Sequence, residues 1–534
     1  MQVEFVLLVL SLLFFASIFT DKIGYKFGVP ALLLFLAVGM LFGPEGIGSW
    51  FGADPIEHIV GIGSAQAVGT IALCVILFSG GMDTKISDIQ PVLAPGVTLA
   101  TIGVLLTACI TGGIVFGFCY LFWSKESSLL LALLIAATMS STDSASVFSI
   151  LRTNGIKLKH NLRPLLELES GANDPMAYIL TITLIGVITG DATDVSVLAI
   201  VQDILVQLVM GAVMGFAFGK IIVWLLRKVQ LSNESLYPIM VLTACIFIFA
   251  MTYYLKGNPY LAVYIGGLII GNSKFTKKRQ TKSFFDGLTW LSQLVMFLML
   301  GLLVRPSDLL QLDVWIPCLC ISIVMILLAR PLSVFLCMLP FKQYKQRDKL
   351  MVSWVGLKGA VPIIFAILCE ASNVPNADFI FNVVFACTLV SLLAQGTSLS
   401  AWAKKLHLAL PQEQEHKLHY FDIDLPEEVE SSAMEIEVTQ QMVEVENQLK
   451  NIQMPPHTLV IMVRREETFF VPGGTTPLKV GDRLLVISDN NAEKVVQETE
   501  DEEAEIRLNW HLNFLHNTGK VLREKWNQLV KDKK

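Results

Sequence analysis

The sequence predicts an all-α polytopic membrane protein of thirteen transmembrane helices, followed by a small cytoplasmic α+β domain. Three observations support this fold class: an apolar composition, a series of long apolar segments, and an uneven distribution of basic residues between the loops. Of the 534 residues, 53% are hydrophobic and 16% are charged, and the mean hydropathy is +0.60. Soluble domains carry about 25% charged residues, so this composition indicates a membrane protein. The net charge of −6 says little about partners, and no nucleic-acid partner is expected.

Thirteen apolar segments precede residue 404, and most approach the length of about 20 residues with which a helix crosses a bilayer. The lipid bilayer is therefore the expected environment of residues 1–404. The first segment lacks a basic start and a small-residue cleavage site, so we expect it to be retained as a membrane span. The predicted helices cover residues 3–20, 28–43, 58–82, 96–123, 128–150, 164–190, 197–227, 236–254, 259–272, 284–304, 314–340, 351–370 and 378–403.

Basic residues in the loops support an odd number of helices. Loops after odd-numbered helices contain eighteen lysine and arginine residues, whereas loops after even-numbered helices contain only Lys125, Lys256 and Arg305. Basic loops tend to remain on the cytoplasmic side of a membrane. The asymmetry therefore predicts an N-terminus outside the cell and a C-terminal domain in the cytoplasm.

Thirteen helices divide into two groups of six around a central seventh helix. Helices 1–6 and 8–13 are offset by an odd number, so matching helices run in opposite directions, as in the inverted repeats of secondary transporters. Helix 5 contains the polar, small-residue run 138–146, and its partner, helix 12, contains Gly356, Gly359 and Pro362. Glycine and proline weaken a helix. We expect both helices to be interrupted, and paired interruptions of this kind indicate a transport site.

Five ionisable residues fall near the middle of predicted membrane helices. A carboxylate there costs about 2.5–3.5 kcal/mol on insertion scales, so a function for these residues is expected. A buried cation needs a carboxylate partner in lipid, which favours a structural ion pair between Glu169 and Arg330 over a direct role in transport. The five residues are Asp143, Glu169, Asp174, Arg330 and Lys358.

Helical spacing separates the polar residues of the sixth predicted helix into two sets. Ser170 and Asp174 are four residues apart and share one face, whereas Glu169 and Asn173 share another face about 100° away. We therefore expect Asp174 and Ser170 to line a site, while Glu169 reaches a separate cation.

Thr142 and Asp143, in the expected interruption of helix 5, would complete that site with Ser170 and Asp174. A carboxylate in a wet cavity can bind a proton or a metal cation, and competition between the two is the simplest mechanism of exchange. Oxygen ligands suit Na⁺ or K⁺, and no cysteine or histidine cluster is present for a softer metal. All nine cysteines lie in apolar segments, so neither a disulfide framework nor a zinc site is expected.

The polar C-terminal part divides into three predicted regions. Residues 405–415 form a linker, residues 416–500 a small α+β domain, and residues 501–534 a helical tail. Within the domain, alternating and β-branched residues predict strands at 458–465 and 484–488 and another that begins at 469–472, in a hairpin-rich segment.

Several motifs together resemble those of the NhaP-type members of the monovalent cation:proton antiporter superfamily. Residues 169–175 (ESGANDP) resemble the helix-6 motif of that family, and Thr142-Asp143 resembles its interrupted helix 5. Arg330–Leu332 and Trp354–Pro362 are similar to its helices 11 and 12, and Phe27–Pro44 is similar to its second helix. The resemblance covers about 400 residues.

This resemblance implies an NhaA/NhaP-like fold of inverted six-helix repeats and a role for each polar residue. Asp174 would alternately carry the cation and the proton, and an Asn-Asp dipeptide at this place implies electroneutral exchange. The sequence departs from the family pattern at Lys358, where many relatives have arginine, and at Ser144, where many have proline. The other implied roles are ligands at Thr142, Asp143 and Ser170, a Glu169–Arg330 pair, and support from Asn173 and Lys358.

The hairpin-rich segment of residues 458–488 is similar to the RCK C-terminal (TrkA-C) domain. That similarity implies the potassium/proton branch of the family, a homodimer, and a regulatory nucleotide on residues 416–500. The alternative is a small domain that only stabilises the dimer. No Gly-x-Gly-x-x-Gly fingerprint occurs, so a complete dinucleotide-binding half is not expected.

The resemblance therefore implies an antiporter of the bacterial inner (plasma) membrane that exchanges K⁺, or Na⁺, for H⁺ by alternating access. One alternative is an RCK-regulated cation channel, although a Thr-Val-Gly-Tyr-Gly selectivity filter is missing. A receptor or scaffold would leave the five mid-membrane charges unexplained. No enzymatic activity and no resident cofactor in the membrane part are expected.

Overall fold

The structure, a computed structural model, describes residues 3–27, 31–46, 61–122, 128–190, 196–411, 433–438, 448–451, 458–466 and 468–488. It divides into two compact units, Met1–Pro411 and Gln412–Lys534. The predicted tail, residues 501–534, and residues 412–415 of the predicted linker lie outside the described residues.

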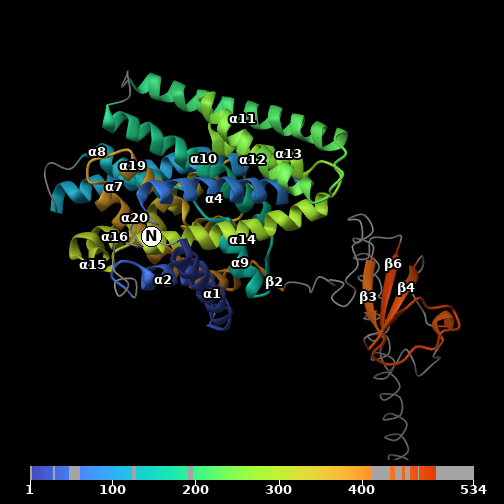
Figure 1. Ribbon diagram of the computed structural model, residues 1–534. Helices are drawn as coiled ribbons and strands as arrows, with labels where there is room; N and C mark the ends of the chain where they lie inside the picture. Colours follow the sequence, from blue (N-terminus) through green and yellow to red (C-terminus); the bar gives the residue numbers. More distant parts are fainter. Residues whose placement is uncertain are drawn as a thin grey trace, which may run out of the picture. The chain divides into compact units, whose positions relative to one another are not determined.

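Helices make up almost all of the first unit (Figure 1), and each of the thirteen ranges predicted to be helical contains helix. The first half of the unit ends with the helix that carries Glu169 and Asp174. Its elements are α1 (Val3–Phe27), α2 (Ala31–Phe42), α4 (Ile62–Asp83), α5 (Ile86–Ile89), η2 (Gln90–Val92), α6 (Leu93–Thr98), η3 (Leu99–Gly103), α7 (Val104–Phe122), α8 (Leu129–Thr138), α9 (Ser144–Thr153) and α10 (Leu162–Thr189).

The second half of the unit contains the other interrupted helix. Its elements are α11 (Val197–Lys228), α12 (Leu236–Tyr254), α13 (Pro259–Gly271), α14 (Lys278–Leu303), α15 (Pro306–Leu309), α16 (Leu312–Val324), η4 (Met325–Ala329), α17 (Arg330–Cys337), α18 (Gln346–Trp354), α19 (Val361–Ala371), α20 (Ala377–Ser391), η5 (Leu392–Gly396) and α21 (Thr397–Lys405).

Eight helices within the described residues are long and apolar enough to cross a membrane. Five further apolar helices have only 10–17 residues. Two of these shorter helices, α8 and α19, are halves of interrupted helices, so their shortness follows from the interruption. The other three are Leu7–Thr20, Ala31–Phe42 and Pro259–Gly271.

Helices 5 and 12 are interrupted as predicted. The first breaks between α8 and α9, and the second breaks between α18 and α19. The sequence did not predict the π-helical turns η3, η4 and η5, which lie inside long helices expected to be regular. Such turns shift the side chains that follow and often occur at functional sites.

The helices of the first unit pack around two main hydrophobic cores. The larger core includes α10, α19 and α20, with fully buried side chains such as Leu165, Phe365 and Phe385. The second core includes α4, α11, α12 and α13 around Phe78 and Cys245. Figure 1 shows α11, α12 and α13 side by side.

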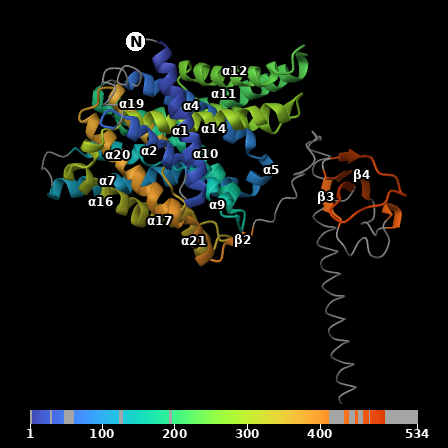
Figure 2. The same cartoon turned by 60° about the horizontal axis from the view of Figure 1, so that its bottom comes forward.

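A short sheet connects the region after helix 5 to the end of the first unit. Strand β1 (Ile156–Leu158) pairs antiparallel with β2 (Ala409–Pro411), and Lys159 N–H donates to the Leu408 carbonyl at 3.1 Å. Figure 2 shows β2 next to the end of α21, and α9 contacts both β1 and α21. Residues 409–411 therefore form a strand, which the prediction of a linker at 405–415 missed because their partner is about 250 residues earlier in the chain.

The second unit contains an antiparallel four-stranded sheet in the order β3-β6-β4-β5. Its strands are β3 (Ala433–Glu437), β4 (Thr458–Arg465), β5 (Thr468–Phe470) and β6 (Arg483–Ser488), and the predicted strands correspond to β4, β5 and β6. Val463, Leu484 and Val486 form its buried core. Arg465 donates two hydrogen bonds to the Asp482 carboxylate, at 2.9 and 2.6 Å, beside the last strand.

Candidate cation and proton site

The interruptions of helices 5 and 12 contact each other directly. Asp143 N–H, just before α9, donates to the Leu357 carbonyl between α18 and α19 at 2.8 Å. An ideal Cβ on Gly359 would collide with the Asp143 side chain, so only glycine allows this approach. The two predicted interruptions therefore cross each other, and a backbone hydrogen bond joins the two unwound segments.

Helix α10 holds this crossing through two polar side chains. The Ser170 hydroxyl donates to the Thr142 carbonyl at 2.7 Å and accepts from Ser144 N–H at 3.0 Å. Asn173 Nδ2 donates to Thr142 Oγ1 at 2.5 Å, and its Oδ1 accepts from Thr142 N–H at 3.4 Å. The spacing argument placed Asn173 on the face of Glu169, but the structure places it against Thr142 together with Ser170.

Asp174 is buried beside this crossing with unused hydrogen-bonding capacity. Its side chain is only 6% exposed, and Oδ1 has no hydrogen-bond partner among the described residues. Buried carboxylate oxygens normally have partners. Asp174 is therefore the acid in this region that is most available to an incoming proton or cation.

Asp143 has a structural role that the sequence interpretation missed. Its Oδ1 accepts from Ser146 N–H at 3.0 Å, and its Oδ2 accepts a short hydrogen bond from the Ser146 hydroxyl. This is the N-cap arrangement, in which a side chain accepts a hydrogen bond from an amide in the first turn of a helix. The spacing Asp143-x-x-Ser146 at the predicted break is the signal that could have revealed the cap.

Glu169 and Arg330 form a buried ion pair, in which Arg330 Nη2 donates to Glu169 Oε1. Their side chains are 1% and 4% exposed. Arg330 follows the π-helical turn η4, and its Nε has no hydrogen-bond partner among the described residues. The Glu169 carboxylate thus neutralises the Arg330 guanidinium, and its role differs from that of Asp174.

Lys358 is buried within the second interruption and binds backbone and hydroxyl groups. Its Nζ donates to the Ser141 carbonyl at 2.8 Å, and its N–H donates to Ser391 Oγ at 3.0 Å. An interrupted membrane helix can offer free backbone carbonyls to an ion. One of them is used by Lys358 in this structure.

Helix α20 and the turn η5 support the second interruption, and sequence reasoning missed them. Ser391 donates to Gln395 Oε1 at 2.5 Å, and Gln395 Nε2 donates to the Trp354 carbonyl at 2.9 Å. Gln395 is 1% exposed. The available signal was this glutamine, one of only two side-chain amides, with Asn382, in the apolar segment 378–403.

The ligand atoms that this site offers to an ion are hard oxygen atoms. Within the described ranges, no group of three or more His, Cys, Asp or Glu residues could hold a metal ion. The polar groups of this crossing are instead hydroxyls, one amide, unwound backbone, the Asp143 carboxylate and the Lys358 ammonium. The oxygen atoms among them suit an alkali cation.

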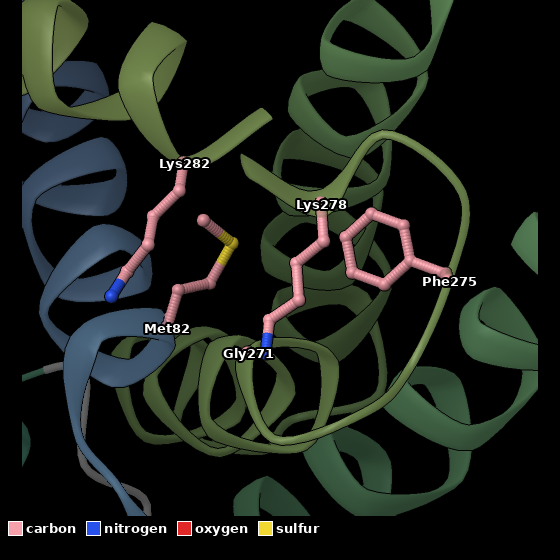
Figure 3. Close-up of a pocket in the computed structure, with 5 residues that line it drawn as sticks. All are labelled: Met82, Gly271, Phe275, Lys278 and Lys282. Carbon is pink, nitrogen blue, oxygen red and sulfur yellow. The ribbon is translucent and has the colours of Figure 1, made fainter. Parts of the chain in front are cut away.

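A separate cavity of about 10 Å³ lies at the ends of α4 and α13 and the start of α14. It has room for about one water molecule. Figure 3 shows the Met82 side chain lying between those of Lys278 and Lys282. Lys282 is paired with Asp83 at 3.1 Å, and no residue of the candidate site lines this cavity.

Comparisons with known proteins identify similar sequences over most of this chain. The family model described as sodium/hydrogen exchanger, transmembrane, matches residues 8–405. The chain is 42% identical to the K(+)/H(+) antiporter NhaP of Alkalimonas amylolytica over 77% of this chain and 68% of the relative. It is 37% identical to the K(+)/H(+) antiporter NhaP2 of Shewanella sp. strain ANA-3 over 90% and 81% of the two chains.

The fold is also similar to a solved structure. The sodium proton antiporter MjNhaP1 from Methanocaldococcus jannaschii superposes with a TM-score of 0.62 and 25% identity, covering 74% of this chain and 100% of that chain. The protein therefore belongs to the sodium/hydrogen exchanger family and is a membrane-embedded cation/proton antiporter.

Proposed function

We propose that this antiporter exchanges K⁺ for H⁺, and that both ions compete for Asp174. The observation that carries the proposal is the buried Asp174 carboxylate, whose Oδ1 has no partner among the described residues. The curated relatives described above are named K(+)/H(+) antiporters, which supports potassium. Sodium is the second candidate, because the solved structural neighbour is a sodium proton antiporter.

In this mechanism Asp174 binds one monovalent cation or one proton whenever the site changes the side of the membrane to which it is open. A proton neutralises the carboxylate in one direction, and a cation does so in the other direction. Thr142 and Ser170 supply further oxygens, and Asp143 shapes the site by capping α9. The charge of the occupied site is then the same in both directions, so exchange is electroneutral. The transition of the empty site between the two sides is unfavourable, because it would bury an unpaired Asp174 carboxylate.

The proposed architecture has thirteen membrane-spanning helices in two inverted repeats. The paired interruptions of helices 5 and 12 and their direct contact support the repeat. The distribution of basic loop residues supports an N-terminus outside and a C-terminal domain in the cytoplasm of a bacterial cell. The assembly is proposed to be a homodimer.

Residues 416–500 are proposed to form an RCK_C-like regulatory domain that binds a small ligand such as a nucleotide. The antiparallel sheet of β3–β6 supports a folded domain in this range. The competing proposal is a domain that only stabilises the dimer. Addition of nucleotides to the transport assay below distinguishes the two, because only a regulatory domain changes the exchange rate.

Vesicles with purified protein and a preset pH gradient test the ion exchanged. K⁺, Na⁺ or Li⁺ is added while internal pH and membrane potential are recorded. We expect K⁺ to collapse the pH gradient at the lowest concentration and without a potential. A response to Na⁺ alone would contradict the proposed selectivity. Cation current without proton movement would contradict exchange and favour a channel.

A further inference from the structure

The interruption of helix 12 leaves one helical hydrogen bond unformed. In a continuous α-helix, the Lys358 N–H would donate to the Trp354 carbonyl, four residues earlier. Instead the Lys358 N–H donates to Ser391 Oγ at 3.0 Å. The Trp354 carbonyl accepts from Gln395 Nε2 at 2.9 Å, and the Ser391 hydroxyl joins the two by donating to Gln395 Oε1 at 2.5 Å. The side chains of Ser391 and Gln395 therefore replace the missing bond.

These two side chains hold their partners from a buried position at the end of α20. Ser391 and Gln395 are 2% and 1% exposed, and Gln395 lies in η5, a π-helical turn of the kind that often occurs at functional sites. The following helix, α21, also holds Trp354, whose indole Nε1 donates to Ser398 Oγ at 3.1 Å and whose ring centroid lies 4.7 Å from that of Trp402. A buried amide costs free energy unless it is hydrogen-bonded, so Gln395 favours the interrupted form of helix 12.

The segment that the pair holds open is the one that contacts helix 5. The Leu357 carbonyl accepts from Asp143 N–H at 2.8 Å, and Lys358 Nζ donates to the Ser141 carbonyl at 2.8 Å. Both contacts depend on the path of the backbone after Trp354, which a continuous helix would not follow. The Ser391–Gln395 pair therefore acts on helix 5 through the unwound segment of helix 12.

We propose that Ser391 and Gln395 are positioning residues for the cation site. Without the pair, the Lys358 N–H is free to bond the Trp354 carbonyl and to extend α18 into the interruption. That change withdraws the backbone of helix 12 from helix 5, so the oxygen ligands of helix 5 lose their fixed place beside Asp174. This inference rests on the role of Asp174 proposed above, and neither Ser391 nor Gln395 binds the ion.

Gln395→Met tests this role, because methionine has nearly the length of glutamine and lacks its amide. A site whose ligands are loosely held binds a cation more weakly. We expect the KM for K⁺ to rise about two- to tenfold, which corresponds to the loss of one hydrogen bond. The maximal rate per folded protein should stay within about twofold, since the change affects binding. The KM is the K⁺ concentration that gives half the maximal rate of collapse of a preset pH gradient in vesicles.

Variants of Ser391 test the pair from its other side. We expect Ser391→Ala to raise the KM for K⁺, and Ser391→Thr, which keeps the hydroxyl, to restore the wild-type value. The double variant Ser391→Ala with Gln395→Met should raise the KM by less than the product of the two single effects, because the residues act as one unit. Thr388→Val is the matched control, since Thr388 is buried on α20 and its hydroxyl donates to the Val384 carbonyl of the same helix at 2.9 Å.

Three results would overturn the positioning role. They are an unchanged KM in folded, active Gln395→Met and Ser391→Ala protein, an equal rise in Thr388→Val, and independent effects in the double variant. If Gln395→Met does not fold, the comparison of Ser391→Ala with Ser391→Thr decides. Exchange by Asp174→Asn at the wild-type rate would instead overturn the proposed function.

Discussion

Glu169 and Asp174 lie five residues apart on one helix and have opposite relations to their surroundings. Glu169 is bound to the buried guanidinium of Arg330, whereas Asp174 has an oxygen without a partner among the described residues. A carboxylate that already neutralises a protein cation has little capacity for a transported one. The structure therefore separates a structural acid from a transport acid within a single motif.

The Glu169–Arg330 pair predicts a defect in folding more than in ion binding. Glu169→Ala leaves a buried guanidinium unpaired, which costs about 3–5 kcal/mol. We expect a much lower yield of folded protein in detergent, while the KM for K⁺ of the folded fraction stays within about twofold. Glu167→Ala, at a partly exposed residue of the same helix, is the matched control. Normal yield with a strongly raised KM would show that Glu169 is a ligand.

For individual residues, the sequence predicted the ion-pair partners better than it predicted the residues that cap helices. The cost of burying Arg330 and the separate faces of α10 were enough to suggest the pair with Glu169. The roles of Ser146 and Asn173 depend on the path of the chain through the break after α8. Helical spacing does not apply inside that break, so it did not place Asn173 against Thr142.

The interrupted helices are the elements that make the site, and they were predictable because their cause is local. Small polar residues in helix 5 and glycines with a proline in helix 12 weaken each helix by themselves. The contact between the two interruptions, and the support from Gln395, depend on long-range packing. The π-helical turns lie in sequences with no such local signal.

The sheet of the second unit depends on an ion pair whose strength varies with pH. Burial alone would raise the pKa of Asp482, but hydrogen bonds from Arg465 and from Lys479 N–H hold this pKa below its usual value. A lowered carboxyl pKa stabilises the folded state above the unfolded pKa of about 3.9. That stabilisation is lost as the pH falls through the folded pKa.

Asp482→Asn is therefore expected to destabilise the sheet at neutral pH by about 1–3 kcal/mol. The difference from wild type should shrink as the pH falls below about 4. Denaturant titration of the full-length protein, followed by hydrogen exchange in peptides covering β4 and β6, measures both effects. Glu466→Gln, at an exposed residue of the neighbouring turn, is the control. Equal stability of Asp482→Asn and wild type at pH 7 would contradict this account.

For the whole molecule, the loop charges and the helix count predicted a topology that composition alone does not supply. Eight helices qualify as spans by length and hydropathy among the described residues, because interrupted and short helices fall below such limits. The family match covers residues 8–405, which include every site residue. The second unit follows the transport domain in the chain, and its regulatory role remains a proposal.

The central claim is that one carboxylate, Asp174, carries both ions. Its most direct test compares wild type, Asp174→Asn and the control Asp203→Asn in vesicles with a preset pH gradient. Asp203 lies on an exposed face of α11 and bonds to Gln207. We predict that K⁺ collapses the gradient in wild type and Asp203→Asn but not in Asp174→Asn. Exchange by Asp174→Asn at the wild-type rate would contradict the mechanism.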